Sequence, residues 1–259
     1  MNMDLPLAIR AFEVLLGWSL LLQSAEYLRL RSLDRVGDWH IQRAEVPNAW
    51  VRQGLDILYQ PTPYACMLWL RAALALVLML GHAGPGSAVL LFVMALLLLL
   101  RWRGAFNGGS DFMTLVGLTG LLLAKVLGLF TDTTSAWHVA LWYVAVQSLS
   151  SYFVSGWVKL MRPEWRSGRA LTVFLDNGVY GPLPANSIYR QPRLAMLCSW
   201  GFTLWEGLFP LALLDVRLAV MFCAIAAVFH FLVFWFFGLN RFFWAWLSTF
   251  PAILYCASV

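Results

Sequence analysis

Eight long apolar stretches make up most of this chain of 259 residues, and they exclude an ordinary soluble domain. The stretches cover about residues 5–28, 64–81, 86–100, 111–130, 137–159, 194–214, 217–239 and 241–258. A helix needs about 20 apolar residues to cross the hydrocarbon core of a bilayer. The stretches are continuous rather than alternating, which favours helices over a closed barrel. The sequence therefore predicts an all-α integral membrane protein, a single transmembrane helical domain over residues 1–259 with about eight spans. The third stretch is short and the second contains Arg71, so a count of seven stays open.

Charged residues are scarce in this chain and unevenly placed. They make up 12% of the residues, against roughly a quarter in a typical soluble domain. Of the 18 Lys and Arg residues, 14 lie in or beside the gaps that follow the first, third, fifth and seventh stretches. By the positive-inside rule these gaps are cytoplasmic, and both termini are expected to be external. The same placement explains most of the net charge of +5, and because no nucleic-acid-binding motif accompanies it, we expect no nucleic-acid partner.

Two of the expected cytoplasmic connections are long. In residues 31–63, apolar positions alternate with charges, which predicts an amphipathic helix on the membrane surface. The apolar positions are Trp39, Trp50, Val51, Leu55 and Ile57. Residues 161–193 are rich in Gly, Pro and Asn and are interpreted as a structured loop, and loops of that length are usually functional or mobile.

A few ionisable residues lie where lipid makes charge expensive, and Lys159 and Glu206 are the first candidates among them. Lys159 ends the aromatic-rich fifth stretch. It is either a helix-end lysine whose ammonium reaches the headgroups, or a partly dehydrated lysine that acts as a base or nucleophile. Glu206 lies in the middle of the sixth stretch, so it either pairs with a cation or stays protonated. The mid-span cations available to it are Lys125 and Arg71, and both a structural ion pair and a functional role stay open.

Further candidates come from the remaining polar residues within or beside the stretches. His230 lies between two phenylalanines and has no second histidine at metal-ligand spacing, so we expect no metal site. Asn107 and Asp111 precede or open the fourth stretch. They form either a loop and helix cap, or a polar cluster at the cytoplasmic mouth of a cavity. Glu13 is also mid-span and is a candidate member of a polar cluster.

Three blocks of sequence, in this order, resemble the horizontally transferred transmembrane domain (HTTM) family, which is the membrane half of vitamin K-dependent gamma-carboxylase. The first block is the run Asn-Gly-Gly-Ser-Asp at 107–111. The second has Gly156, Lys159 and Leu160, followed by Trp165 and Gly168. The third has Glu206, Pro210, His230, Gly238, Leu239 and Pro251. Together the blocks span about residues 100–255, and the resemblance places the protein in the bacterial inner membrane.

The resemblance implies a membrane-embedded enzyme in which Lys159 is a base acting on a lipophilic quinone, such as vitamin K hydroquinone. We expect Glu206 and His230 to complete the catalytic group, and Asn107, Asp111 and Trp165 to bind the cofactor. The essential histidine of the carboxylase falls on or beside Gly109, so this chain lacks it. The expected reaction is therefore carboxylase-like or a quinone-linked oxidoreductase or lyase step, rather than gamma-glutamyl carboxylation itself.

Two other classes of function stay open besides an enzyme. The first is a non-enzymatic maturation or export partner for a secreted peptide or toxin, which would bind a peptide substrate or a second membrane subunit. The second is a small-solute or proton carrier built around Glu13, Lys125, Glu206 and His230, since buried charges mark such pathways. The carrier ranks last because the sequence shows no pair of matching interrupted helices of the kind that many transporters contain.

Overall fold

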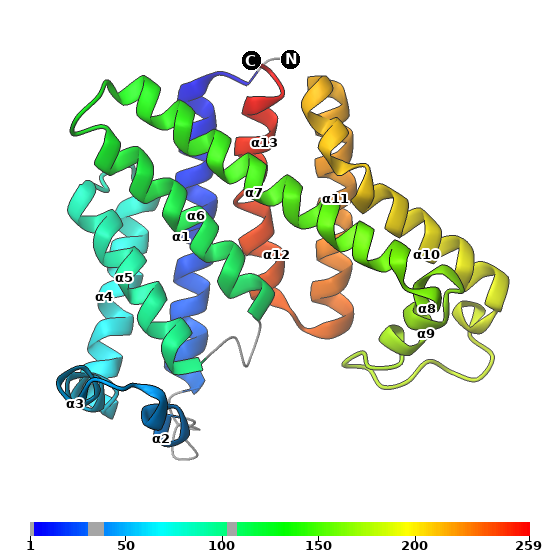
Figure 1. Ribbon diagram of the computed structural model, residues 1–259, viewed down its shortest axis with the longest axis horizontal. Helices are drawn as coiled ribbons and strands as arrows, with labels where there is room; N and C mark the ends of the chain where they lie inside the picture. Colours follow the sequence, from blue (N-terminus) through cyan, green and yellow to red (C-terminus); the bar gives the residue numbers. More distant parts are fainter. Residues whose placement is uncertain (1–2, 31–38, 103–107) are drawn as a thin grey trace. The chain divides into compact units, whose positions relative to one another are not determined.

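The computed structural model describes residues 3–30, 39–102 and 108–259, and every regular element within them is helical (Figure 1). The long helices are α1 (Leu5–Leu30), α4 (Pro61–Met79), α5 (Pro85–Trp102), α6 (Gly108–Leu127), α7 (Thr133–Met161), α10 (Pro192–Gly207) and α11 (Val216–Phe237). The shorter α-helices are α2 (Trp39–Gln42), α3 (Ala49–Leu58), α8 (Pro163–Arg166), α9 (Arg169–Leu175), α12 (Asn240–Leu247) and α13 (Phe250–Cys256). The 3₁₀ helices are η2 (Arg43–Glu45), η3 (Ile188–Arg190) and η4 (Phe209–Leu214). The expected all-α class is confirmed.

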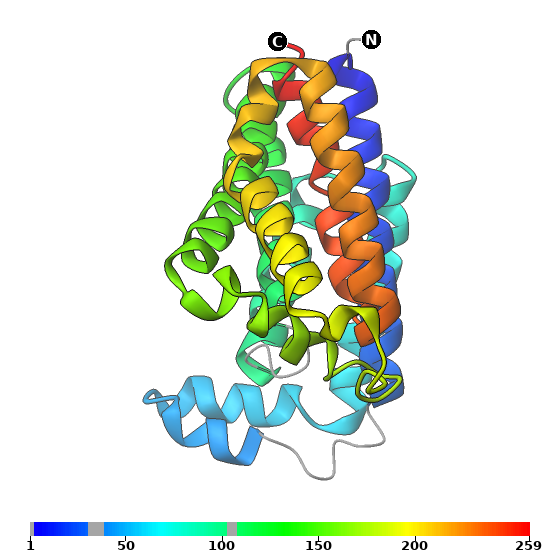
Figure 2. The ribbon, with the colours of Figure 1, turned by 90° about the vertical axis from the view of Figure 1, so that its right-hand side faces the viewer.

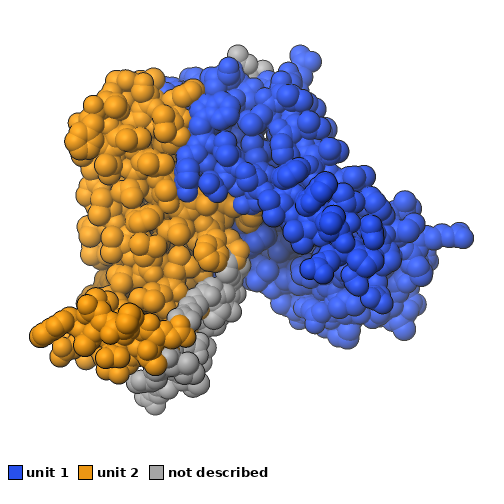
Figure 3. Space-filling model, viewed as in Figure 1, with its two compact units in different colours: residues 1–8, 141–243, 249–259 blue, residues 9–140, 244–248 orange. Residues whose placement is uncertain are grey.

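The chain forms two compact units (Figure 3). Unit 1 consists of residues 1–8, 141–243 and 249–259, and unit 2 of residues 9–140 and 244–248. Unit 1 therefore contains most of α7 and all of α8–α11, whereas unit 2 contains most of α1 and all of α2–α6. The two ends of the chain meet in unit 1, where the hydroxyl of Ser258 donates a hydrogen bond to the carbonyl of Met3 over 3.1 Å.

Five of the described helices are long and apolar enough to cross a membrane: α1, α4, α5, α6 from Gly109 onward, and α11. They correspond to five of the eight apolar stretches, and α11 has the highest mean hydropathy, 2.4. α7 is longer, at 29 residues, but is not among the five. Its second half carries Gln147 and a series of serines, which lower its hydropathy.

The remaining two apolar stretches are interrupted rather than continuous helices. Residues 194–214 form α10 and then the 3₁₀ helix η4, with Pro210 in the first turn of η4. Residues 241–258 form α12 and α13, with Pro251 in the first turn of α13. Proline lacks the backbone N–H of an α-helical hydrogen bond and clashes with the preceding turn, so each α-helix ends before it. The sequence shows no pair of matching interrupted helices, and the structure interrupts both of these segments beside a proline.

The connection between α1 and α4 contains the expected amphipathic helix, α3. Asn48 caps it by accepting hydrogen bonds from the backbone N–H groups of Trp50 and Val51. Leu55 is buried in the core of unit 2, whereas Trp50, Val51 and Ile57 are 81%, 52% and 56% exposed. Figure 2 shows α3 lying across the ends of the long helices of unit 2, at the start of α4. An apolar face is thus exposed beside the start of a helix long enough to span the bilayer.

α3 is held in place by contacts on both of its flanks. Asp56 accepts hydrogen bonds from the guanidinium of Arg43 at 2.7–2.9 Å and from the indole of Trp39 at 3.0 Å. The hydrogen bonds from Arg43 lower the pKa of the Asp56 carboxyl below its ordinary value. Tyr59, directly after α3, donates its hydroxyl to the carbonyl of Leu97 over 2.8 Å, and burial raises its pKa to about 12.

Candidate functional site

The candidate site in unit 1 begins with one face of α7. Tyr152, Ser155 and Lys159 are spaced by three and then four residues, so their side chains share a face of the helix. Tyr152 is buried, and the side chain of Lys159 is 15% exposed. This face of α7 therefore carries polar groups over two helical turns, although the residues between them in the sequence are mostly apolar.

A close crossing of α7 and α10 supplies the partner for this face. A Cβ atom added to Gly156 would collide with the backbone nitrogen of Gly207 and lie 2.9 Å from the carbonyl oxygen of Thr203. Only a glycine allows two helix backbones to approach this closely. Glu206 precedes Gly207, so the crossing brings its carboxylate to the polar face of α7.

The geometry around Lys159 is that of a desolvated ion pair. Its Nζ atom donates hydrogen bonds to Glu206 Oε2 over 2.5 Å and to Ser155 Oγ over 2.6 Å. The hydroxyl of Ser155 also lies 3.3 Å from Glu206 Oε1. The side chain of Glu206 is 5% exposed. Sequence reasoning offered Lys125 and Arg71 as the mid-span cations for Glu206, but the structure pairs it with Lys159.

Two aromatic rings complete the surroundings of the ammonium group. Lys159 Nζ lies 4.8 Å from the ring centroid of Phe202 and 5.4 Å from that of Trp165. Cations are attracted to aromatic faces at such distances, most strongly where water is excluded. Trp165 was expected to belong to the site, whereas Phe202, one turn before Glu206 on α10, was missed. The sequence gives no signal for it, because the chain has 18 phenylalanines.

Trp165 is held in position by the attachment of α8 to α10. The hydroxyl of Ser199 donates to the carbonyl of Trp165, and the indole of Trp200 donates to the carbonyl of Arg166 over 3.0 Å. Gly168 has a φ of +80°, and a Cβ there would collide with the backbone between Ala195 and the next residue. Trp165 and Gly168, which belong to the second of the three sequence blocks, therefore both lie where α8 packs onto α10.

These contacts define the surroundings of the Lys159 side chain. A carboxylate, a hydroxyl and two aromatic rings lie around its Nζ atom. Lys159 becomes a base only after it gives up a proton, and Glu206 is the group within reach to accept it. The pair is thus able to hold one proton in either of two positions.

His230 belongs to a second polar contact in unit 1, two helical turns of α7 away from Lys159. Its Nε2 atom lies 2.5 Å from the hydroxyl of Tyr152. Phe229 and Phe242 pack around the imidazole, with ring centroids 5.0 and 5.1 Å away. Tyr152 also packs against Trp205, the residue before Glu206. His230 is therefore linked to the ion pair through packed aromatic rings. Among the described residues, no three His, Cys, Asp or Glu side chains gather as a metal site requires.

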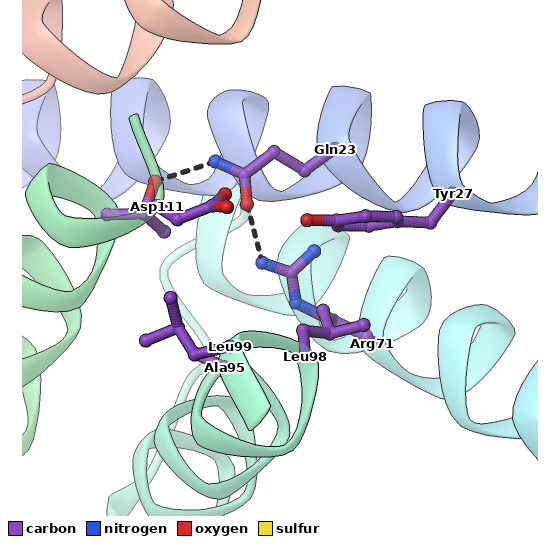
Figure 4. Close-up of a pocket in the computed structure, with 8 residues that line it drawn as sticks. Gln23, Tyr27, Arg71, Ala95, Leu98, Leu99 and Asp111 are labelled. Carbon is purple, nitrogen blue, oxygen red and sulfur yellow. Dashed lines mark hydrogen bonds between the residues drawn. The ribbon is translucent and has the colours of Figure 1, made fainter. Parts of the chain in front are cut away.

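The remaining expected residues lie elsewhere. Asn107 is outside the described residues. Asp111 lies in the first turn of α6, in unit 2, and is buried. It lines a pocket whose empty space is about 230 Å³, part of it open to the outside. The pocket is also lined by Gln23, Tyr27, Arg71, Ala95, Leu98, Leu99 and Thr114 (Figure 4).

Arg71 organises the polar side of this pocket. It is 1% exposed and donates to Gln23 Oε1 over 2.8 Å, to Ser24 Oγ over 3.0 Å and to the carbonyl of Leu20 over 3.2 Å. Gln23 in turn donates to Thr114 Oγ1 over 2.6 Å. The sequence identified Arg71 as a mid-span cation but gave no sign of the polar residues that α1 and α6 bring to it.

Glu13 and Lys125 form a separate ion pair in unit 2. Lys125 Nζ lies 3.0 Å from Glu13 Oε1, and Arg10 Nη1 lies 2.8 Å from Glu13 Oε2. The four residues considered for a carrier therefore divide into two pairs of locations. Glu13 and Lys125 lie in unit 2, and Glu206 and His230 lie in unit 1.

Comparison with known proteins finds no matching family model, no matching curated protein and no matching solved structure.

Proposed function

We propose that this protein is a membrane-embedded enzyme of the carboxylase-like HTTM type, in which Lys159 and Glu206 transfer a proton to and from a lipophilic, quinone-like molecule. The observation that carries the proposal is the 2.5 Å contact between Lys159 Nζ and Glu206 Oε2, beside the rings of Trp165 and Phe202. A structural helix-end lysine would extend its ammonium toward water, whereas this one is directed into a desolvated site.

The proton balance of the pair explains how an ammonium ion serves as a base. Glu206 accepts a proton from Lys159, which leaves an amine and a carboxylic acid, both neutral. Loss of both charges is least costly where solvation is poor, because burial penalises the ionised forms. The lone pair of the Lys159 amine then takes the proton of a substrate hydroxyl, and the ammonium so formed stabilises the oxyanion that remains.

The surroundings of the pair suit a flat, apolar substrate that arrives from the bilayer. Trp165 and Phe202 offer aromatic faces on which a ring stacks. On the outer side of α7, Trp157 and Val158 are 55% and 51% exposed, and on α10 Leu204 is 48% exposed. A hydroquinone would supply an acidic hydroxyl and a reducing ring when bound there. These features fit the quinone that the HTTM resemblance implies.

The proposal includes a topology of eight crossings in a bacterial inner membrane, with both termini external. The three crossings beyond the five apolar helices would be α7, the interrupted α10–η4 segment and the interrupted α12–α13 segment. The hydrogen bond between Ser258 and Met3 supports an even number, because it keeps both ends of the chain together. The basic gaps support the orientation.

The first experiment is native mass spectrometry with lipid extraction on the purified protein, comparing wild type with Lys159→Ala. Lys125→Ala is the matched control, since it removes another partly buried lysine from an ion pair. We expect a quinone or other isoprenoid in wild type and the control, and its loss in Lys159→Ala. Turnover of that molecule should then be lost in Lys159→Arg, because arginine does not give up its proton.

Other outcomes would contradict the proposal. Full turnover in Lys159→Arg would exclude a lysine base. A peptide or protein subunit retained in all three samples, with no small molecule, would instead favour the maturation or export partner.

A specific observation favours a second candidate, a small-solute or proton carrier. α10 ends one residue after Glu206, and η4 follows it, so the buried carboxylate lies at an interrupted helix. Interrupted helices with polar groups at the break are common at transporter binding sites. Flux driven by a solute or pH gradient in liposomes, abolished by Glu206→Gln, would support the carrier and count against the enzyme.

A further inference from the structure

The outer face of α11 carries an apolar stripe along the length of the helix. Met221, Ile225, Val228, Leu232 and Trp235 are spaced by alternating steps of four and three residues and are each 44–61% exposed. Residues at this spacing share one helix face. Because α11 is apolar and long enough to cross a membrane, the stripe is the surface that this helix would present to lipid.

A turn from the long loop between α9 and α10 is fixed to the C-terminal end of this stripe. The backbone N–H of Val179 donates to the carbonyl of Phe236 over 2.8 Å, and the ring of Tyr180 lies 6.4 Å from that of Trp235. A Cβ on Gly178 would lie 3.2 Å from the same carbonyl of Phe236. In Figures 1 and 2, the loop lies beside the end of α11 in both views.

The loop is internally braced, so its apolar residues cannot easily turn inward. Asp176 accepts hydrogen bonds from Arg190 over 2.7 Å and from the backbone N–H of Leu183 over 2.9 Å. Gly181 has a φ of +87°, a conformation that L-residues rarely adopt. These contacts hold Val179 and Tyr180 on the surface of unit 1, where they are 60% and 68% exposed.

We propose that the turn of residues 178–181 is embedded in the headgroup layer of the phospholipid bilayer, with Val179 and Tyr180 as its anchors. The turn continues the lipid-facing stripe of α11 at the level of Trp235, and Tyr and Trp rings concentrate at that depth because one end is apolar and the other polar. We infer that the bilayer, rather than another protein, covers Val179 and Tyr180, because these two residues extend the lipid-facing surface of α11. The inference goes beyond the proposed function and does not depend on the chemistry of Lys159.

The test uses the full-length protein in phospholipid nanodiscs, with its four native cysteines replaced and one cysteine introduced for an environment-sensitive fluorophore. The labelled positions are Tyr180→Cys in the turn, Asn186→Cys as an exposed polar position of the same loop, and Val228→Cys in the middle of the stripe. Lipids brominated in the acyl chain report contact with the bilayer by quenching the fluorophore.

We expect the label at position 180 to emit at shorter wavelength than the label at 186, and to be quenched by brominated lipid as the label at 228 is. Water-like emission at 180, without quenching, would overturn the proposal. Emission at shorter wavelength without quenching would also overturn it, because the turn would then be covered by protein rather than by lipid.

Discussion

Replacing Glu206 by leucine would leave the ammonium of Lys159 in a desolvated site without its carboxylate. Two unit charges 2.5 Å apart attract by about 7 kcal/mol at an effective dielectric constant near 20. Desolvation of both groups offsets most of this attraction, whereas removing one partner of such a pair costs about 3–5 kcal/mol. Because Lys159 lies near a helix end, the lower value applies. We expect Glu206→Leu and Lys159→Met each to lower the free energy of unfolding by about 3 kcal/mol.

The double variant Glu206→Leu/Lys159→Met tests whether the two side chains form an ion pair or contribute to stability independently. Without either charge only the hydroxyl of Ser155 remains as a polar group, so the double variant should lose about 2–3 kcal/mol less than the sum of the single variants. The assay is reversible unfolding in mixed micelles, followed by far-UV circular dichroism. In thermal unfolding each single variant should lower the Tm by about 6–12 °C.

A second cycle serves as the control for this prediction. Arg43→Met removes a cation that binds Asp56 instead, so its effect should add to that of Lys159→Met within about 0.5 kcal/mol. If Glu206→Leu and Lys159→Met also prove additive within that margin, the two side chains do not interact in the membrane protein. The proton-transfer pair would then have to be abandoned.

Three further predictions follow from the described contacts. Gly156→Ala should lower the free energy of unfolding by about 1–3 kcal/mol, because the added Cβ meets the α10 backbone. The control Gly201→Ala has open space around it and should raise the free energy of unfolding by up to about 1 kcal/mol. Equal effects of the two variants on unfolding in micelles would contradict the close crossing of α7 and α10. The carboxyl of Asp56 has a lowered pKa in the folded protein, so its stabilising effect is present above about pH 4 and lost as pH falls through the lowered value. Asp56→Asn should reduce the loss of thermal stability below pH 4, and an unchanged acid profile would count against the Arg43 contact. Arg71→Lys should cost about 1–3 kcal/mol of unfolding free energy, because lysine cannot reproduce the fork of hydrogen bonds, and an unchanged Tm would refute that network.

Hydropathy was sufficient to predict the helical class and the positions of five helices. α1, α4, α5, α6 and α11 all lie where the apolar stretches predicted them. The stretches at 194–214 and 241–258 were predicted as continuous helices, although Pro210 and Pro251 gave a local signal for the interruptions. Mean hydropathy depends on composition and not on backbone hydrogen bonds, so it does not register an interruption by proline.

The candidate site could be predicted only as a set of separate residues. Lys159, Glu206 and Trp165 were recognised as candidates, and the structure brings them together. Phe202 was missed, and Glu206 was assigned to the wrong cations. The pairing depends on the crossing at Gly156, and a crossing is a property of two helices rather than of either sequence.

The sequence by itself determined which segments are apolar enough to leave water and where charge is rare, because both depend on neighbouring residues only. The tertiary structure decided which of the rare charges meet. Glu13 binds Lys125, Glu206 binds Lys159, and Arg71 binds neutral groups from α1. Each isolated charge in lipid is costly, but that cost does not tell which partner the charge meets, so the sequence cannot rank the partners. Helix packing selects among them, because ion pairing acts over a few ångströms and packing sets those distances.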